Sequence, residues 1–245
     1  MAAAVVKVLE SEAAVAQKLC EVVIEKANAA INDRGVFVVG VSGGSAAKFL
    51  CSGLPSATTD WTKWRIFFCD ERYVPYSDPE CTYTIYKDGL VSKVPALADL
   101  IYPINPDIPV EEAAEDYLKK IRSVLPGNSI PRFDLLVLGM GPDGHTCSLF
   151  PGHPLLKETS KFVAPIKDSP KPPPSRVTLT FPVVNNAACA VFASCGAGKA
   201  DILQRVLEGG DGDPLPAAMV RPTNGQVIWF LDSSAAAKLK NVQKL

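Results

Sequence analysis

Histidine is scarce in this sequence. Only His145 and His153 carry an imidazole among 245 residues, and they form no His-Glu-x-x-His pattern. The seven cysteines include no Cys-x-x-Cys pair. Because the usual ligand spacings of zinc sites are missing, we expect no bound metal. An odd number of cysteines without such pairs is typical of buried thiols in a reducing compartment.

A strong net charge and long hydrophobic runs are also missing. The formal net charge is -1 at pH 7, which gives no electrostatic reason to expect nucleic acid or an anionic membrane as a partner. No apolar run reaches the ~18 residues that a membrane span needs. Residues 1–18 lack the pattern of a secretory signal, so we expect a cytoplasmic protein. The C-terminal Gln243-Lys244-Leu245 is distantly similar to the Ser-Lys-Leu signal and leaves a peroxisomal location as the alternative.

Short apolar runs alternate with helical patterns along the chain. The runs are typical of strands buried on both faces and occupy residues 36–41, 65–69, 133–138, 188–193 and 226–230. Helices are predicted from a Ser11 cap to about Ile31, from Ser45, through Leu207, and in the Ala-rich segment after the last run. The alternation predicts an α/β fold with an open, mainly parallel sheet and helices on both faces.

One domain is expected over residues 1–245. The segment most similar to a linker is the proline-rich stretch 169–175. Strands and helices alternate on both sides of it, so we interpret it as a surface loop.

Four of the predicted strands lead directly into a segment rich in glycine or in charged residues. These segments are 42–45, 70–72, 139–145 and 196–199. Loops that leave the carboxyl ends of parallel strands share one edge of the sheet, where ligands bind. The sequence therefore predicts a single site built from these four segments.

Two of these segments carry groups that suit an anion. Gly43, Gly44 and Ser45 precede a predicted helix and would offer backbone N–H groups at its positive end, although a plain tight turn has the same composition. Arg72 follows Asp70 and offers a planar donor fork for phosphate or carboxylate. A surface ion pair is the alternative for this arginine.

The segment 196–199 resembles half of a P-loop but does not complete it. The Walker pattern needs Gly at position 193 and Ser or Thr at position 200, where this chain has Ala193 and Ala200. A nucleotide site is therefore not predicted. Lys199, in the first turn of a helix, could still meet a phosphate or could simply be solvated.

Residues 139–144 match the Gly-x-Gly-x-x-Gly pattern of dinucleotide sites. That pattern needs a full helix next, whereas Pro151 and Pro154 leave room for only about two turns. We interpret the glycines as shaping a loop that presents Asp143 and His145. An imidazole with a pKa near ~6.5 suits proton transfer at neutral pH, and Asp143 could orient it, although a structural histidine is the alternative. We interpret the neighbouring Cys147 as a buried thiol.

Taken together, these segments resemble the 6-phosphogluconolactonase family. The matching stretches are 42–45, 70–75, 139–152, 176–180 and 196–199, in the order that the family has. The family belongs to a wider sugar-phosphate isomerase-like fold with Rossmann-like topology, which includes glucosamine-6-phosphate deaminase. The deaminase has a carboxylate beyond its histidine, whereas residues 146–150 here hold none. One departure is Ala46-Ala47-Lys48, where many members have Thr-Pro.

The resemblance implies hydrolysis of 6-phospho-D-glucono-1,5-lactone to 6-phosphogluconate without a metal or organic cofactor. It implies that His145 deprotonates the attacking water and that Asp143 holds the ring. The implied substrate-binding residues are Gly43, Gly44, Ser45, Asp70, Arg72, Arg176 and Lys199. The expected partner is a phosphorylated sugar lactone, and the expected assembly is a monomer or weak homo-oligomer. An enzyme of the deaminase or isomerase type and a non-catalytic sugar-phosphate sensor are the alternatives.

Overall fold

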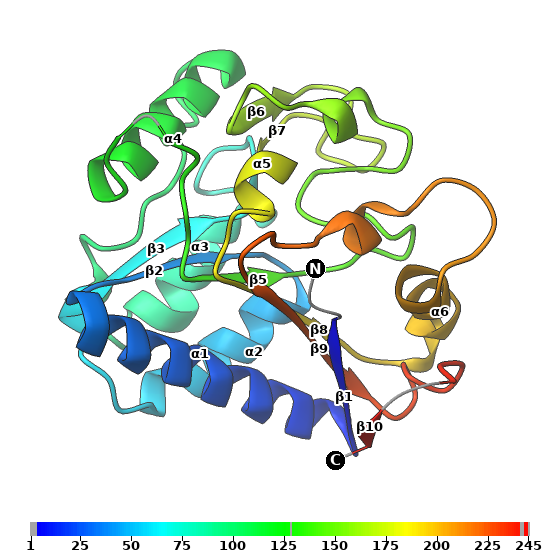
Figure 1. Ribbon diagram of the computed structural model, residues 1–245. Coiled ribbons are helices and arrows are strands. Elements are labelled where there is room, and N and C mark those ends of the chain that lie inside the picture. Colours follow the sequence, from blue (N-terminus) through cyan, green and yellow to red (C-terminus); the bar gives the residue numbers. More distant parts are fainter. Residues whose placement is uncertain (1–3, 128, 241–242, 245) are drawn as a thin grey trace.

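The main sheet is parallel and has helices on both faces. The computed structural model describes residues 4–127, 129–240 and 243–244. Within them, seven strands lie in the order β10-β1-β9-β8-β5-β2-β3, and every neighbouring pair is parallel (Figure 1). Their bounds are β1 (Val5–Leu9), β2 (Phe37–Val41), β3 (Trp64–Phe68), β5 (Leu135–Leu138), β8 (Cys189–Ser194), β9 (Gln226–Asp232) and β10 (Gln243–Lys244). The predicted α/β class is confirmed.

A second, antiparallel sheet has the order β4-β7-β6 within the described residues. Its strands are β4 (Asp70–Arg72), β6 (Val163–Ile166) and β7 (Arg176–Leu179). Residues 70–72 were expected to be a loop after β3. They form β4 instead, because their backbone pairs with β7, far along the chain. Three residues are too few to show a strand pattern.

Helices cover both faces of the main sheet. α1 (Glu12–Arg34) runs along one face, and α4 (Val110–Val124) and α5 (Phe181–Val184) lie over the other (Figure 1). The remaining α-helices of the described residues are α2 (Ser45–Gly53), α3 (Thr82–Tyr86) and α6 (Ala200–Glu208). Ser11 caps α1 as expected, accepting from the Ala14 N–H at 3.2 Å. The helix extends three residues beyond the expected Ile31, to Arg34, and ends at left-handed Gly35.

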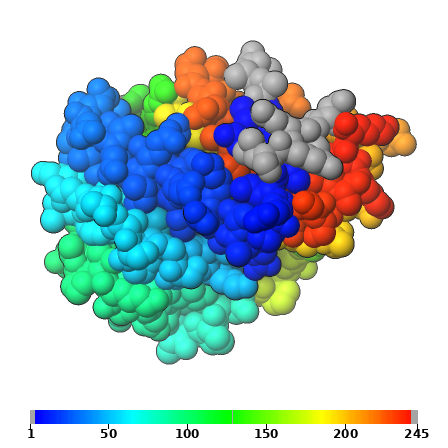
Figure 2. All heavy atoms as spheres, turned by 90° about the horizontal axis from the view of Figure 1, so that it is seen from below, coloured from blue at the N-terminus to red at the C-terminus, as the bar shows by residue number. Residues whose placement is uncertain are grey.

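The first and last strands of the described chain, β1 and β10, are paired in parallel. β1 pairs with β9 along five residues, and the space-filling view shows the blue N-terminal and red C-terminal segments in contact (Figure 2). The prediction of an Ala-rich helix after β9 is wrong, since residues 233–238 form turns. The Asp232 carboxylate accepts a hydrogen bond from the Ala235 N–H at 2.7 Å, and Ala235 is buried. These two contacts stabilise a turn directly after β9. Of the C-terminal tripeptide, Leu245 lies outside the described residues.

The strand order reverses between β2 and β5. β2 continues through α2 to β3 on one side, whereas β5 continues to β8 on the other. Connections that leave neighbouring strands in opposite directions open a crevice at the carboxyl ends of the strands. The segments 42–45 and 139–145 follow β2 and β5 and therefore flank this crevice. No described helix is long and apolar enough to cross a membrane.

Candidate active site

A cavity of ≈ 250 Å³ opens at this crevice. Eight of the nine site residues expected from the sequence line it, and the ninth, Asp143, contacts His145. The eight are Gly43, Gly44, Ser45, Asp70, Arg72, His145, Arg176 and Lys199. The structure thus brings all four predicted segments to one place, together with β7.

Three charged or titratable side chains meet at His145, which lines the cavity. Nδ1 of His145 lies 2.5 Å from Oδ1 of Asp143. The ammonium of Lys171 donates to the same oxygen at 3.0 Å and lies 3.3 Å from the histidine Nδ1. The imidazole also packs against the ring of Phe150, with 4.6 Å between centroids. The histidine is therefore held by a hydrogen bond and by an aromatic face.

A sharp turn presents His145 and requires glycine at position 141. The Gly141 N–H donates to the carbonyl of His145 at 2.9 Å, and the Gly144 N–H donates to the carbonyl of Gly141 at 3.0 Å. A Cβ at Gly141 would lie 2.1 Å from Cε1 and Nδ1 of the imidazole and 2.6 Å from Oδ1 of Asp143. Any side chain here would displace the pair. The glycines of this loop thus make room for the histidine and its acid, and the loop is followed by no dinucleotide-type helix.

The electrostatics select one protonation state of the pair. Burial tends to raise the pKa of Asp143, but hydrogen bonds from His145 and Lys171 outweigh it and lower that pKa to about 2. Burial lowers the pKa of His145 below its usual 6.5, against the opposing effect of the Asp143 charge. At neutral pH the aspartate is ionised and the imidazole is neutral. Because the ionised aspartate can only accept at Nδ1, that nitrogen carries the hydrogen and Nε2 is the basic atom.

Two arginines lie opposite each other on the antiparallel sheet. The register pairs Arg72 of β4 with Arg176 of β7. Arg72 donates to the carbonyl and the carboxylate of Glu80 at 3.0 and 2.8 Å and is 25% exposed. Asp70 lies 3.9 Å from Arg176 and accepts from the Ser148 hydroxyl at 2.7 Å. Each guanidinium thus has one acid nearby, and both groups line the cavity, where their remaining N–H groups are available to an anionic ligand.

Arg176 also ties the proline-rich segment to the site. Its guanidinium is 4% exposed and donates to the carbonyls of Pro173 at 3.1 Å, Lys171 at 3.1 Å and Pro172 at 2.9 Å. It lies 5.8 Å from the centre of the Phe150 ring. Burial lowers the pKa of Arg176 from its usual value, and the charge of Arg72 lowers it further, against the opposing charge of Asp70. The guanidinium nevertheless stays charged at any physiological pH.

Further donors face the cavity from β2 and β8. Lys199 precedes α6, and its ammonium donates to the carbonyl of Met140 at 2.7 Å. Burial, and then the charge of Lys171, lowers its pKa. Gly44 has φ 63° and ψ -136°, a backbone conformation that glycine alone adopts freely, and it precedes α2, where no side chain caps the helix. The first N–H groups of α2 are thus available to a ligand.

Two site residues were not identified from the sequence. Lys171 belongs to the segment interpreted as a surface loop, and its proximity to His145 depends on a long-range fold. A rigid Pro-Lys-Pro-Pro-Pro stretch, suited to holding a side chain in place, was the available signal. Ser42 lines the cavity, and its buried Oγ has no hydrogen-bond partner within the described residues. That hydroxyl is free to pair with a bound molecule.

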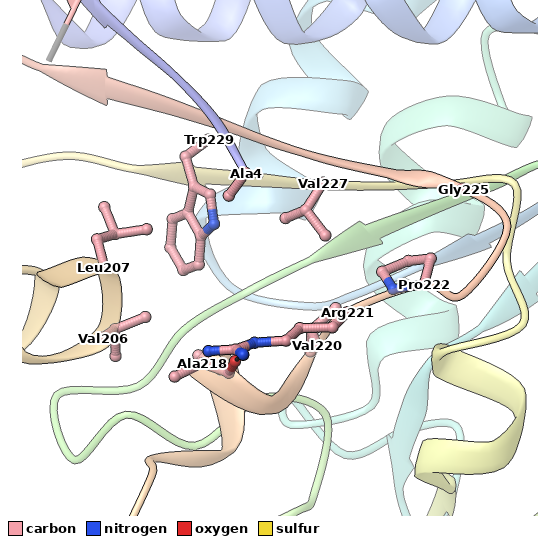
Figure 3. Close-up of a pocket in the computed structure, with 11 residues that line it drawn as sticks. Ala4, Val206, Leu207, Ala218, Val220, Arg221, Pro222, Gly225, Val227 and Trp229 are labelled. Carbon is pink, nitrogen blue, oxygen red and sulfur yellow. Dashed lines mark hydrogen bonds between the residues drawn. The ribbon is translucent and has the colours of Figure 1, made fainter. Parts of the chain in front are cut away.

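A second cavity, of ≈ 460 Å³, lies beside β9 and α6 (Figure 3). Trp229, Val206 and Leu207 form its apolar wall, and Arg221 is its one charged lining residue among those described. It contains no acid–base pair. Within the described residues, no group of three or more His, Cys, Asp or Glu side chains could hold a metal ion.

The comparisons with known proteins decide the family. A family model described as glucosamine-6-phosphate isomerases/6-phosphogluconolactonase matches residues 10–229. The chain belongs to this family. It is 50% identical over 240 residues to 6-phosphogluconolactonase from Bos taurus, covering 96% of this chain and 93% of the relative. The corresponding human protein is 49% identical with the same coverage.

Solved structures of the family share the fold. The crystal structure of 6-phosphogluconolactonase from Thermotoga maritima superposes with a TM-score of 0.82 at 28% identity, covering 94% of this chain and 99% of the other. The 6-phosphogluconolactonase from Trypanosoma brucei gives a TM-score of 0.86 at 26% identity, covering 97% and 99%. The family assignment therefore extends over nearly the whole chain.

Proposed function

We propose that this chain hydrolyses 6-phospho-D-glucono-1,5-lactone to 6-phosphogluconate, the second step of the oxidative pentose phosphate pathway. One observation carries the proposal: an imidazole that contacts an aspartate through Nδ1 lines the same cavity as Arg72, Arg176 and Lys199. A general base and an anion-binding surface within one small cavity suit a substrate with a reactive carbonyl and a phosphate. The names of the relatives support this substrate.

His145 acts as the base in the proposed mechanism. Its Nε2 takes a proton from a water molecule as the water oxygen bonds to C1 of the lactone. The proton then passes to the ring oxygen as the bond between C1 and that oxygen breaks, which gives the free hydroxyl and a carboxylic acid at C1. The acid loses its remaining proton to solvent and leaves as the carboxylate. Asp143 stabilises the imidazolium that exists between the two transfers. General-base assistance of this kind contributes about 10²–10⁴-fold.

The cationic side of the cavity holds the substrate. Arg72 and Lys199 bind the 6-phosphate, with Arg176 beside them, and the N–H groups of residues 43–45 donate to the phosphate or to sugar hydroxyls. Asp70 and the unpaired Ser42 hydroxyl are available to the sugar. Fixing the phosphate fixes C1 relative to His145, and positioning of this kind can lower a barrier by several kcal/mol.

Position 150 favours a lactonase over a deaminase. The deaminase type has a carboxylate beyond its histidine, whereas here the tilted ring of Phe150 packs against the imidazole and residues 146–150 hold no acid. The site thus has one acid–base pair, which suffices for water attack and protonation of the ring oxygen.

We also propose that the protein works in the cytoplasm as a monomer or weak homo-oligomer, as one domain.

A substrate comparison tests the proposal. Stopped-flow measurement on the purified chain, corrected for spontaneous ring opening, is expected to show rapid hydrolysis of the phosphorylated lactone. Glucosamine-6-phosphate is expected to release no ammonia. Ammonia release would favour the deaminase type. Binding of 6-phosphogluconate with no lactone turnover would favour a sensor.

A further inference from the structure

Lys171 occupies a position that the proposed mechanism does not yet use. It lies in the proline-rich segment 169–175, outside the lining of the cavity, and its side chain is 35% exposed. Its ammonium nevertheless contacts the Asp143–His145 pair. The nitrogen lies 3.0 Å from Oδ1 of Asp143 and 3.3 Å from Nδ1 of His145. The oxygen that holds the imidazole is therefore shared between two side-chain donors.

The backbone around Lys171 is held from several directions. Its carbonyl accepts from Arg176 at 3.1 Å and from the Ser169 hydroxyl at 2.7 Å, and its N–H donates to that hydroxyl at 3.2 Å. Prolines at 170 and 172 flank it and restrict the chain further. A long, flexible side chain rarely keeps one position on a protein surface, but this lysine starts from a fixed backbone.

We infer that Lys171 is a positioning residue for the reaction: its ammonium anchors the Asp143 carboxylate and keeps His145 uncharged and ready to accept a proton. The inference rests on the proposed function, because it gives Lys171 a role through the proposed base. It adds a third member to the pair, supplied by a segment that looks like a plain surface loop.

The signs of the surrounding charges support this role. The charged groups around the imidazole are Asp143 on its own loop, Lys171 on the proline-rich segment, Asp70 and Arg72 on β4, Arg176 on β7 and Lys199 before α6. Burial lowers the pKa of His145, Asp143 and Asp70 raise it, and Lys171 lowers it. A carboxylate bonded to the imidazole would otherwise favour the imidazolium, which cannot act as a base. The nearby Lys171 ammonium offsets the effect of that carboxylate on the pKa of His145.

Direct titration of His145 tests the inference. Because the chain has only two histidines, the ring signals of His145 can be assigned in a nuclear magnetic resonance spectrum by their loss in His145→Gln. In Lys171→Met we expect the titration midpoint of His145 to move to higher pH. The value of kcat/KM should fall about five- to tenfold at pH 6 and recover as the pH rises past the new midpoint.

Two further variants separate charge from structure. Lys171→Gln keeps a hydrogen-bond donor without the charge and should shift the titration in the same direction as Lys171→Met. The exposed Lys161 serves as the matched control, and Lys161→Met should leave both the titration and the pH profile unchanged. Circular dichroism on each variant reports whether it is folded. If Lys171→Met does not fold, Lys171→Gln still tests the inference.

The possible outcomes are distinct. An unmoved His145 titration in folded Lys171→Met or Lys171→Gln, or an activity loss that is equal at all pH values, would overturn the inference. A shifted titration in a chain that never hydrolyses the lactone would leave the Lys171 contact standing and refute the proposed function instead.

Discussion

Replacing Gly141 with alanine offers a sharp test of the active-site geometry. The added Cβ would lie 2.1 Å from two atoms of the His145 ring, whereas ordinary contacts between such atoms are about 3.5 Å or more. The ring must therefore move by about 1.4 Å or rotate away from Asp143. The backbone at Gly141 does not have a positive φ, so alanine brings no backbone strain of that kind.

The size of the effect follows from this displacement. A misplacement of about 1 Å in a catalytic group can cost about 10²-fold in rate, and complete loss of a general base costs up to about 10⁴-fold. We expect kcat for Gly141→Ala to fall by at least about 100-fold. The groups proposed to hold the phosphate lie on other segments, so the affinity for 6-phosphogluconate should stay within about threefold of the parent protein, which is well below 1 kcal/mol.

Stopped-flow lactone hydrolysis gives kcat, and titration calorimetry with 6-phosphogluconate gives the affinity. Gly198→Ala is the matched control, because a Cβ there meets nothing within 4 Å and the residue does not line the cavity. The control should retain its activity. If Gly141→Ala kept a kcat near that of the parent protein, the position of the imidazole would not matter and the proposed role of His145 would be wrong.

Two other predictions follow from the same contacts. Burial lowers the pKa of His145, and only the neutral imidazole accepts a proton. The value of kcat/KM should therefore be flat near pH 7–8 and decline on the acid side with a midpoint below 6.5. A midpoint above 7 in a stopped-flow pH series would contradict this. Arg176→Met leaves three carbonyls without their buried charged donor and should reduce the free energy of unfolding by roughly 2–4 kcal/mol, as measured by urea denaturation. A loss below about 0.5 kcal/mol would show that these bonds contribute little.

The buried parallel strands were the most predictable part of the fold. β2, β5 and β8 are continuous apolar runs because helices cover both faces of the sheet, and their sequences show this directly. β4 was not visible, because residues 70–72 are charged and its pairing with β7 depends on residues more than a hundred positions away. The Ala-rich segment 233–238 has helical composition but forms turns, with the Asp232 carboxylate accepting the Ala235 N–H.

The candidate site residues that could be predicted from the sequence are those that directly follow a strand. His145, Arg72 and Lys199 each lie at or just beyond the carboxyl end of a strand of the main sheet, and parallel topology then brings them together. Lys171 lies in no such position. It reaches His145 because β6 and β7, on either side of the proline-rich segment, pair with each other and fix the place of that segment. The prolines indicate that the segment is stiff, but they do not indicate which residue lies beside it.

The most direct test of the account compares His145→Gln with the parent protein in a stopped-flow assay of 6-phosphogluconolactone hydrolysis, at saturating substrate. Removal of the proposed base should lower kcat by about 10²–10⁴-fold, while 6-phosphogluconate still binds. Turnover by His145→Gln close to that of the parent protein would contradict the central claim that this imidazole activates water.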